Sequence, residues 1–187
     1  MAKALDPSHR RMTVDEVLAW LDEGPQGVRY ELVAGEPVAM APERAAHARR
    51  KSRIWRALSD ALEACGLPGE ALPDGVTIQV DEHTAYGPDA VVHCDETLPD
   101  DAAIVPAPVI VVEVLSPSTR AHDAGAKLAD YFRLPSVRHY LLVRTERPTL
   151  IHHRRGEGDL IETRIVTEGR LRLDPPGIEL DLDRIYG

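Results

Sequence analysis

Cysteine and long apolar runs are both scarce in this sequence. Only two of its 187 residues are cysteines, Cys65 and Cys94, so a disulfide scaffold is not expected. Neither has a second Cys or His at zinc-finger spacing, and we expect both to be small buried apolar residues. No stretch approaches the roughly 18 apolar residues that span a bilayer, and residues 1–11 lack an apolar signal region. These absences predict a cytoplasmic protein with no membrane contact.

Basic residues are in the minority. The chain has 22 Lys and Arg against 31 Asp and Glu, which gives a net charge of −9. This balance argues against nonspecific coating of nucleic acid, because phosphate neutralisation by Lys and Arg supplies most of that affinity. A local basic groove stays open, since six basic residues fall between Arg44 and Arg56. On a helix, Arg49, Arg53 and Arg56 would share one face, either as a solvated surface or as a phosphate-contacting stripe.

Apolar spacing and turn residues predict one α/β domain over 1–187, with 1–11 as a disordered tail. Thr13 and Glu16 form a capping box at the start of a helix, and Gly66 is the expected left-handed cap of a longer one. The expected elements are helices at 13–21, 42–65 and 121–133, a hairpin of 29–33 with 37–40, and strands at 75–80, 89–93, 109–115, 138–143, 149–153, 160–166 and 171–173. Strands 109–115 and 138–143 would be parallel, joined by a crossover helix, and the last three strands would form an antiparallel meander. We therefore expect a central mixed β-sheet flanked by helices.

Two carboxylates interrupt the apolar strands. Asp89 begins the run Asp89-Ala90-Val91-Val92-His93, and Glu113 lies inside Val109–Leu115. An ionised carboxylate in such a strand is costly unless something compensates it, and a divalent cation shared by Asp89 and Glu113 would do so. Lys127 lies in the following crossover helix, which packs back over its own sheet, so its amine could reach the carboxylates. The sequence therefore predicts charge chemistry at a strand end.

Each of these residues also has a plainer interpretation. Asp89 could be a turn residue that caps the strand entry, and Lys127 could extend along the helix surface. Glu31 could lie on the exposed face of the hairpin. Ser118 or Thr119 suits a helix N-cap better than a nucleophile. Five histidines lack the paired helical spacing of a zinc site, so we expect surface or packing roles for His83, His93, His122, His152 and His153.

The residues around this site resemble the Uma family of endonucleases, a branch of the PD-(D/E)XK restriction-endonuclease-like superfamily. The resemblance rests on Pro88-Asp89, on Glu113-Val114-Leu115-Ser116-Pro117-Ser118-Thr119, and on Asp123, Lys127 and Tyr131. It extends to residues 30–36 and 140–143, and so covers nearly the whole chain. The Glu-Val-Leu-Ser-Pro-Ser-Thr run is a specific signal, whereas Pro-Asp alone would mean little.

The resemblance implies a restriction-endonuclease-like core in which Asp89 and Glu113 bind Mg²⁺ or Mn²⁺. It implies that Lys127 assists hydrolysis of a phosphodiester, in place of the more usual lysine two residues after the acid, where this chain has Leu115. Glu31 is similar to the additional acid that superfamily members bring to the metal. Similar proteins often carry a histidine near His47, which becomes a candidate contact either to phosphate or to the residues that bind the metal.

Three functions from different classes stay open. The first is a Mg²⁺-dependent DNA endonuclease acting as a homodimer, since cutting two strands with one site per chain favours pairing. The second is a catalytically silent module that binds nucleic acid or protein. The third is a metal-dependent hydrolase of a smaller phosphoester. The presence of Asp89, Glu113 and Lys127 favours an enzyme, and the acidic net charge argues mildly against tight DNA binding.

Overall fold

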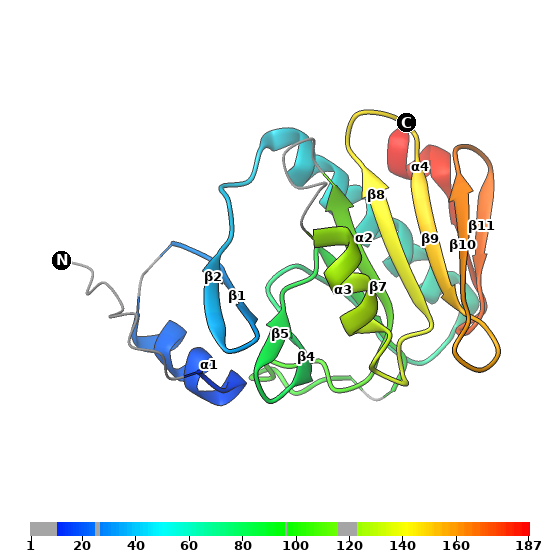
Figure 1. The fold of residues 1–187 in the computed structure, drawn as a ribbon. Coiled ribbons are helices and arrows are strands. Elements are labelled where there is room, and N and C mark those ends of the chain that lie inside the picture. Colours follow the sequence, from blue (N-terminus) through cyan, green and yellow to red (C-terminus); the bar gives the residue numbers. More distant parts are fainter. Residues whose placement is uncertain (1–10, 25–26, 96, 116–122) are drawn as a thin grey trace.

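A computed structural model describes residues 11–24, 27–95, 97–115 and 123–187 (Figure 1). Residues 1–10 of the tail predicted at 1–11, and the predicted N-cap at Ser118 or Thr119, lie outside these residues. The helices are α1 (Val14–Glu23), α2 (Ala45–Cys65), α3 (Asp123–Tyr131) and α4 (Leu182–Tyr186). None of the helices in the described ranges is long and apolar enough to cross a membrane.

Two of the predicted helix caps are present. The backbone N–H of Thr13 donates to Glu16 Oε2 at 2.9 Å, and the N–H of Glu16 donates to Thr13 Oγ1 at 3.2 Å. This reciprocal pair is the predicted capping box at the start of α1. Gly66 ends α2 with φ 59°, the left-handed conformation that glycine adopts without steric cost.

A six-stranded mixed sheet forms the centre of the molecule, with strand order β10-β9-β8-β7-β6-β3. Strands β7 and β8 are parallel and α3 connects them, which confirms the predicted crossover unit, while the other neighbours are antiparallel. Strand β7 is buried along nearly its whole length, as a central strand with a helix on each face must be. The bounds are β3 (Glu70–Pro73), β6 (Ala90–His93), β7 (Pro108–Leu115), β8 (His139–Arg144), β9 (Leu150–Arg155) and β10 (Ile161–Val166).

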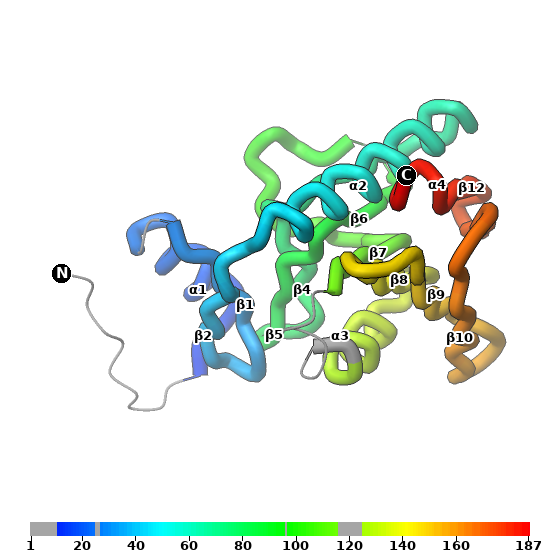
Figure 2. The backbone as a smooth tube through the Cα atoms, turned by 90° about the horizontal axis from the view of Figure 1, so that it is seen from above, coloured from blue at the N-terminus to red at the C-terminus, as the bar shows by residue number. Residues whose placement is uncertain are grey.

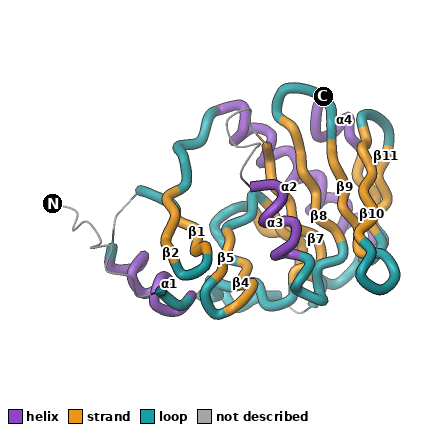
Figure 3. Tube along the Cα trace, viewed as in Figure 1, coloured by secondary structure: helices purple, strands orange, loops and turns teal. Residues whose placement is uncertain are grey.

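The remaining strands form two smaller sheets. One has the order β2-β1-β5-β4, with β1 (Tyr30–Val33) and β2 (Glu36–Ala39) forming the predicted hairpin beside β5 (Thr84–Tyr86) and β4 (Ile78–Asp81). The other pairs β11 (Arg170–Leu173) with β12 (Ile178–Asp181). Figure 3 shows β11 close to β10 in projection, and the buried residues of this hairpin pack in the same core as α2.

The C-terminal strands differ from the prediction in one pairing. Strands β9 and β10 are antiparallel neighbours as expected, but β11 pairs with β12 and does not continue the meander. The physical reason is burial, because both β11 and β12 point alternate apolar residues into the core beside α2. The elements that the sequence did not predict are β3, β5, β12 and α4.

Helices α2 and α3 cover opposite faces of the central sheet (Figure 2). Alternate residues of β7 therefore enter two different cores, with Val112 and Val114 on the α2 side and Val111 and Leu115 on the α3 side. Glu113 lies on the α3 side with Val111 and Leu115, because its carboxylate meets side chains of α3. This arrangement directs one charged group of the apolar strand toward the crossover helix.

The expectation for the cysteines was wrong at one position. Cys94 is partly buried and packs against the α2-side core, but Cys65 is exposed. Cys65 is the last residue of α2 and lies beyond Leu62, the last buried residue of that helix.

Candidate active site

Asp89 and Glu113 lie beside each other at the end of the central sheet. Asp89 precedes β6, and its backbone N–H donates to Val112 O at 3.0 Å. Its side chain turns back onto the same strand, since Oδ2 accepts the N–H of Val114 at 2.7 Å. Two backbone bonds on either side of Glu113 thus hold Asp89 next to it, and both residues are buried.

Lys127 joins this pair from α3. Its Nζ lies 2.7 Å from Glu31 Oε1 on β1 and 3.1 Å from Glu113 Oε1 on β7. Tyr131 is one helical turn further on, so it lies on the same face of α3, and its hydroxyl donates to Glu113 Oε1 at 2.9 Å. Two sheets and a crossover helix therefore bring Glu31, Glu113, Lys127 and Tyr131 together in what we call the acid–lysine cluster.

Burial decides between the interpretations left open by the sequence. Lys127 is 4% exposed and Glu31 is 9% exposed, so neither extends along a solvated surface. Their contact with each other offsets part of the cost of removing both charges from water. Asp89 accepts a backbone hydrogen bond from Val114 of the neighbouring strand β7, and it is buried against charged groups of α2.

The electrostatics of the site follow from burial and from the partners. Burial raises the pKa of the Glu113 carboxyl, against the opposing effect of Lys127, and Asp89 raises it further. Burial likewise raises the pKa of Asp89, against the effect of His47. For Lys127, burial acts to lower the pKa of the amine, but Glu113 and Glu31 raise it above its usual value. The amine is therefore a fixed positive charge between two carboxylates, a state in which it orients groups and does not remove protons.

The donor atoms that remain suit a hard divalent cation. Both bonds to Glu113 fall on Oε1, and its Oε2 accepts no hydrogen bond from the described part of the chain. Asp89 uses Oδ2 for the backbone bond, while the contact of Oδ1 is with Lys51 at 3.9 Å. Each carboxylate thus keeps an oxygen for a ligand, and carboxylate oxygens are what Mg²⁺ and Mn²⁺ take. The residues fit the cation that the sequence predicts.

A second group of possible metal ligands lies on the other side of Asp89. Glu43, His47 and Asp89 place ligand atoms within 4.8 Å of one another, and this is the grouping of three found among the described residues. His47 Nε2 donates to Val114 O at 2.7 Å and lies 3.4 Å from Asp89 Oδ2, and its Nδ1 lies 2.8 Å from Glu43 Oε1. Glu31 does not belong to this group; its Oε1 is bonded to Lys127.

Lys51 already brings positive charge to this second group. It is 6% exposed, contacts Glu43, and lies 2.9 Å from Asp74 Oδ2. Burial acts to raise the pKa of Glu43, but hydrogen bonds from Lys51 and His47 lower it overall. The group is therefore largely compensated by the chain itself, unlike the free oxygens of Asp89 and Glu113.

Glu43, Lys51 and Asp74 were not predicted as site residues. Lys51 follows His47 by four residues, so helical spacing places both on one face of α2, which is a signal present in the sequence. Asp74 comes from the loop after β3 and carried no such signal. Tyr131 was named only as part of a motif, and its bond to Glu113 was not expected.

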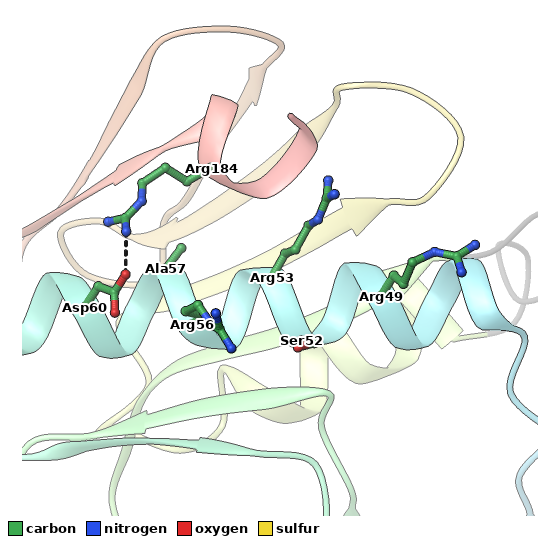
Figure 4. Close-up of a pocket in the computed structure, with 7 residues that line it drawn as sticks. All are labelled: Arg49, Ser52, Arg53, Arg56, Ala57, Asp60 and Arg184. Carbon is green, nitrogen blue, oxygen red and sulfur yellow. Dashed lines mark hydrogen bonds and ion pairs between the residues drawn. The ribbon is translucent and has the colours of Figure 1, made fainter.

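The predicted basic residues of α2 separate into two faces. His47 and Lys51 face the sheet and Asp89, whereas Arg49, Arg53 and Arg56 are exposed on the opposite side of the helix. Figure 4 shows these three arginines lining a pocket in which Arg184 of α4 pairs with Asp60. Asp60 is the one acid that lines this pocket beside four arginines, so the pocket carries a net positive charge in a chain of net charge −9.

This chain is similar to a known protein family, to a relative of similar length and to a solved structure. The Uma2 family, described as "Putative restriction endonuclease", matches residues 14–184. The uncharacterized protein slr1290 of Synechocystis sp. is 29% identical over 178 residues, which are 94% of this chain and 92% of that protein. A crystal structure from Anabaena variabilis, described as a "putative nuclease belonging to DUF820", has a TM-score of 0.72 at 16% identity and covers 94% of this chain and 97% of its own. This likeness concerns the fold, and it confirms the predicted fold class.

Proposed function

Because the chain belongs to the Uma2 family of restriction-endonuclease-like proteins, we propose that it is a metal-dependent endonuclease that hydrolyses phosphodiester bonds of DNA. The observation that carries this proposal is the buried convergence of Asp89, Glu113 and Lys127, in which each carboxylate keeps an oxygen for a ligand. Structural ion pairs alone do not need such spare oxygens at a strand end.

Asp89 and Glu113 would hold the divalent cation, Mg²⁺ or Mn²⁺. When bound, such a cation lowers the pKa of a water molecule and neutralises phosphoryl oxygens. The backbone bonds to Val114 and Val112 fix the Asp89 carboxylate, and Tyr131 fixes that of Glu113. The protein therefore supplies oxygens that are already oriented before a ligand arrives.

Lys127 supplies positive charge where negative charge develops in the transition state, and it orients the attacking water. The bond from Lys127 to Glu31 Oε1 supports a positioning role for Glu31. The metal contact that the sequence predicts for Glu31 stays a prediction. His47 holds the far side of Asp89 and is the predicted phosphate contact nearest to the acids.

Arg49, Arg53 and Arg56 would contact the DNA backbone away from the acids. Their exposed positions and shared pocket support a role in affinity and not in chemistry. Phosphate contacts of this kind weaken with salt, by about one unit of slope in log affinity against log salt for each contact. The cytoplasmic location predicted from the sequence also stays a prediction.

A cleavage assay tests the proposal. Plasmid, linear duplex and single-stranded DNA are incubated with Mg²⁺ or Mn²⁺ and the wild type, Asp89→Asn, Glu113→Gln, or the exposed control Glu179→Gln. We expect cleavage by the wild type and the control, and a loss of at least ~10²-fold in the two site variants. Cleavage that survives both substitutions contradicts the proposal. Binding without cleavage indicates a silent module, and hydrolysis of only small phosphoesters indicates the third class of function.

The arginines are tested separately by the variant Arg49→Gln/Arg53→Gln/Arg56→Gln. We expect weaker DNA binding and a salt slope reduced by up to about three units, with the cleavage rate at saturating DNA unchanged. An unchanged salt slope would assign these arginines to a solvated outer surface.

A further inference from the structure

The outer edge of β10 is an unpaired strand edge with exposed apolar side chains. Strand β10 ends the six-stranded sheet, and in the described residues it pairs only with β9. Its residues are exposed from Ile161 to Ile165, and Ile165 is 67% exposed. An unpaired edge of this kind can pair with another strand, and natural proteins usually protect it.

The opposite edge of the same sheet is protected. Strand β3 has four residues and ends at Pro73, which cannot donate a backbone hydrogen bond. The carbonyl of Ala71 accepts the indole N–H of Trp55 at 2.8 Å. Strand β10 has six residues and contains no proline or lysine. Its edge therefore lacks the protection that the β3 edge has.

Hydrogen bonds of β9 determine which backbone groups of β10 point outward. The N–H of Arg155 donates to Arg138 O at 3.0 Å and Thr149 O accepts from Arg144, so odd-numbered residues of β9 bond toward β8. Even-numbered residues bond toward β10, as the bond from Gly156 N to Leu160 O at 2.9 Å illustrates. The partners of these residues in β10 are Glu162, Arg164 and Val166. Antiparallel pairing alternates, so the backbones of the odd-numbered residues, Ile161, Thr163 and Ile165, point outward.

The residues of β10 are arranged around Thr163 so that each residue is matched by a complementary one at the same distance on the other side. The sequence Leu160-Ile161-Glu162-Thr163-Arg164-Ile165-Val166 has apolar residues at equal distances from Thr163, and opposite charges directly beside it. We propose that β10 pairs with β10 of a second copy of this chain, antiparallel, with the two-fold axis at Thr163. Each Ile161 then faces Ile165 of the partner, and each Glu162 faces the partner's Arg164.

Backbone direction and charge together select this register. The outward groups of one strand must meet outward groups of the other, so the axis must pass through a residue and not between two. An axis at Glu162 would place two glutamates opposite each other, and an axis at Arg164 would place two arginines opposite each other. Like charges directly opposite are destabilising, whereas opposite charges and β-branched pairs stabilise the ladder. Only the axis at Thr163 satisfies all of these conditions near the centre of the strand.

The resulting dimer is isologous and joins two six-stranded sheets into one. A strand edge buries less surface than a typical stable interface, so we expect dimerisation to depend on protein concentration. The pairing uses no residue of the acid–lysine cluster, and its test is independent of nuclease activity.

Analytical ultracentrifugation of charge variants tests the pairing. We expect the wild type to dimerise, and Glu162→Arg and Arg164→Glu each to weaken the dimer by at least ~10-fold, because each places like charges opposite each other. The double variant Glu162→Arg/Arg164→Glu restores opposite charges and should recover the dimer. Arg154 lies 3.9 Å from Glu162 within the chain, so Arg154→Gln is the control for loss of that contact, and it should dimerise normally.

Cysteine cross-linking tests the register. In a Cys65→Ser/Cys94→Ala background, Thr163→Cys should form an intermolecular disulfide on oxidation, since paired residues of adjacent strands lie about 5.5 Å apart at Cα. Ile161→Cys should not, because its partner is Ile165. A wild type that stays monomeric at every accessible concentration overturns the proposal. Failure of the double charge variant to recover the dimer, or equal cross-linking at 161 and 163, also overturns it.

Discussion

Two buried polar clusters occupy neighbouring strands of the central sheet, and they solve the problem of burial differently. The acid–lysine cluster lies on the α3 side of β7 and consists of charged groups that offset one another. The other is a histidine pair, His139 on β8 and His152 on β9, whose ring nitrogens Nδ1 and Nε2 lie 2.9 Å apart. Both clusters are at least 90% buried.

The histidine pair is neutral. His139 Nε2 lies 2.8 Å from Pro175 O, which can only accept, so Nε2 carries the proton. A neutral His139 then accepts at Nδ1, and His152 Nε2 donates to it. Burial lowers the pKa of His139 to about 4 and that of His152 to about 3, with the nearby Arg154, Arg138 and Arg164 acting in the same direction.

The difference separates a packing role from a reactive one. In the histidine pair, three of the four ring nitrogens are committed to each other or to the backbone, and the rings carry no charge. In the acid–lysine cluster one amine faces two carboxylates through Glu31 Oε1 and Glu113 Oε1, and Oε2 of Glu113 is left over. Buried polar groups indicate a functional site when they are charged and only partly committed.

Removing Lys127 should have the largest effect on stability. Lys127→Met leaves Glu31 and Glu113 buried without their cation, and breaking a buried ion pair typically costs about 3–5 kcal/mol. Urea unfolding at pH 7.5 measures the loss. The double variant Lys127→Met/Glu113→Gln removes one of the stranded charges and should regain part of it. A loss below about 1 kcal/mol in the single variant would mean that the amine is solvated.

The histidine pair should make the fold sensitive to acid. The folded-state pKa values are depressed, so between pH 7.5 and 5.5 the unfolded chain binds protons at these histidines while the folded pair does not. Stability is therefore present above the unfolded pKa of about 6.5 and falls as pH decreases, by about 2–3 kcal/mol for the pair over this window. The variant His139→Phe/His152→Leu should lose this dependence in urea unfolding, whereas a substitution of the more exposed His83, His83→Gln, should keep it. The same slope in all three proteins would show that the pair binds protons freely.

Of these variants, Tyr131→Phe should have the smallest effect on stability. It tests whether the acid–lysine cluster has a role in cleavage. Loss of the bond to Glu113 Oε1 should cost about 1–2 kcal/mol of unfolding free energy and reduce cleavage several-fold, since the carboxylate is less firmly oriented. Tyr186→Phe is the matched control, because its hydroxyl donates to Thr149 O at 2.7 Å far from the acids. The control should lose stability and keep full cleavage at a temperature where both variants are folded. Equal cleavage by the two variants would give Tyr131 a packing role only.

Much of the fold could be predicted because its signals are local. The capping box of Thr13 and Glu16, the glycine at 66 and the apolar run 109–115 each reflect short-range physics. Strands β3 and β5 could not, since one contains Pro73 and the other has three residues, and both depend on neighbours distant in sequence. Strand β11 was recognised, but its partner β12 has only four residues and follows a proline turn, so its alternation of Ile178 and Leu180 is too short a signal by itself.

Part of the site could be predicted, because few structural roles account for a charged residue among apolar neighbours. That argument identifies Glu113 from its strand and Lys127 from the crossover rule. The resemblance to the Uma family added Glu31 and His47. The contacts of Glu43, Lys51 and Asp74 depend on how the start of α2 packs against the loop after β3. No local sequence pattern indicates that packing. The division of α2 into an arginine face and a face toward Asp89 follows from helical periodicity once the buried side is known.

Calorimetric titration with Mn²⁺ tests most directly whether Asp89 and Glu113 together hold the cation. We predict one binding event in the wild type, its loss in Asp89→Asn and in Glu113→Gln, and its retention in Glu43→Gln, because Glu43 is already engaged by Lys51. The opposite pattern, with binding lost in Glu43→Gln and kept in Glu113→Gln, would move the metal to the Glu43, His47 and Asp89 group and contradict the account.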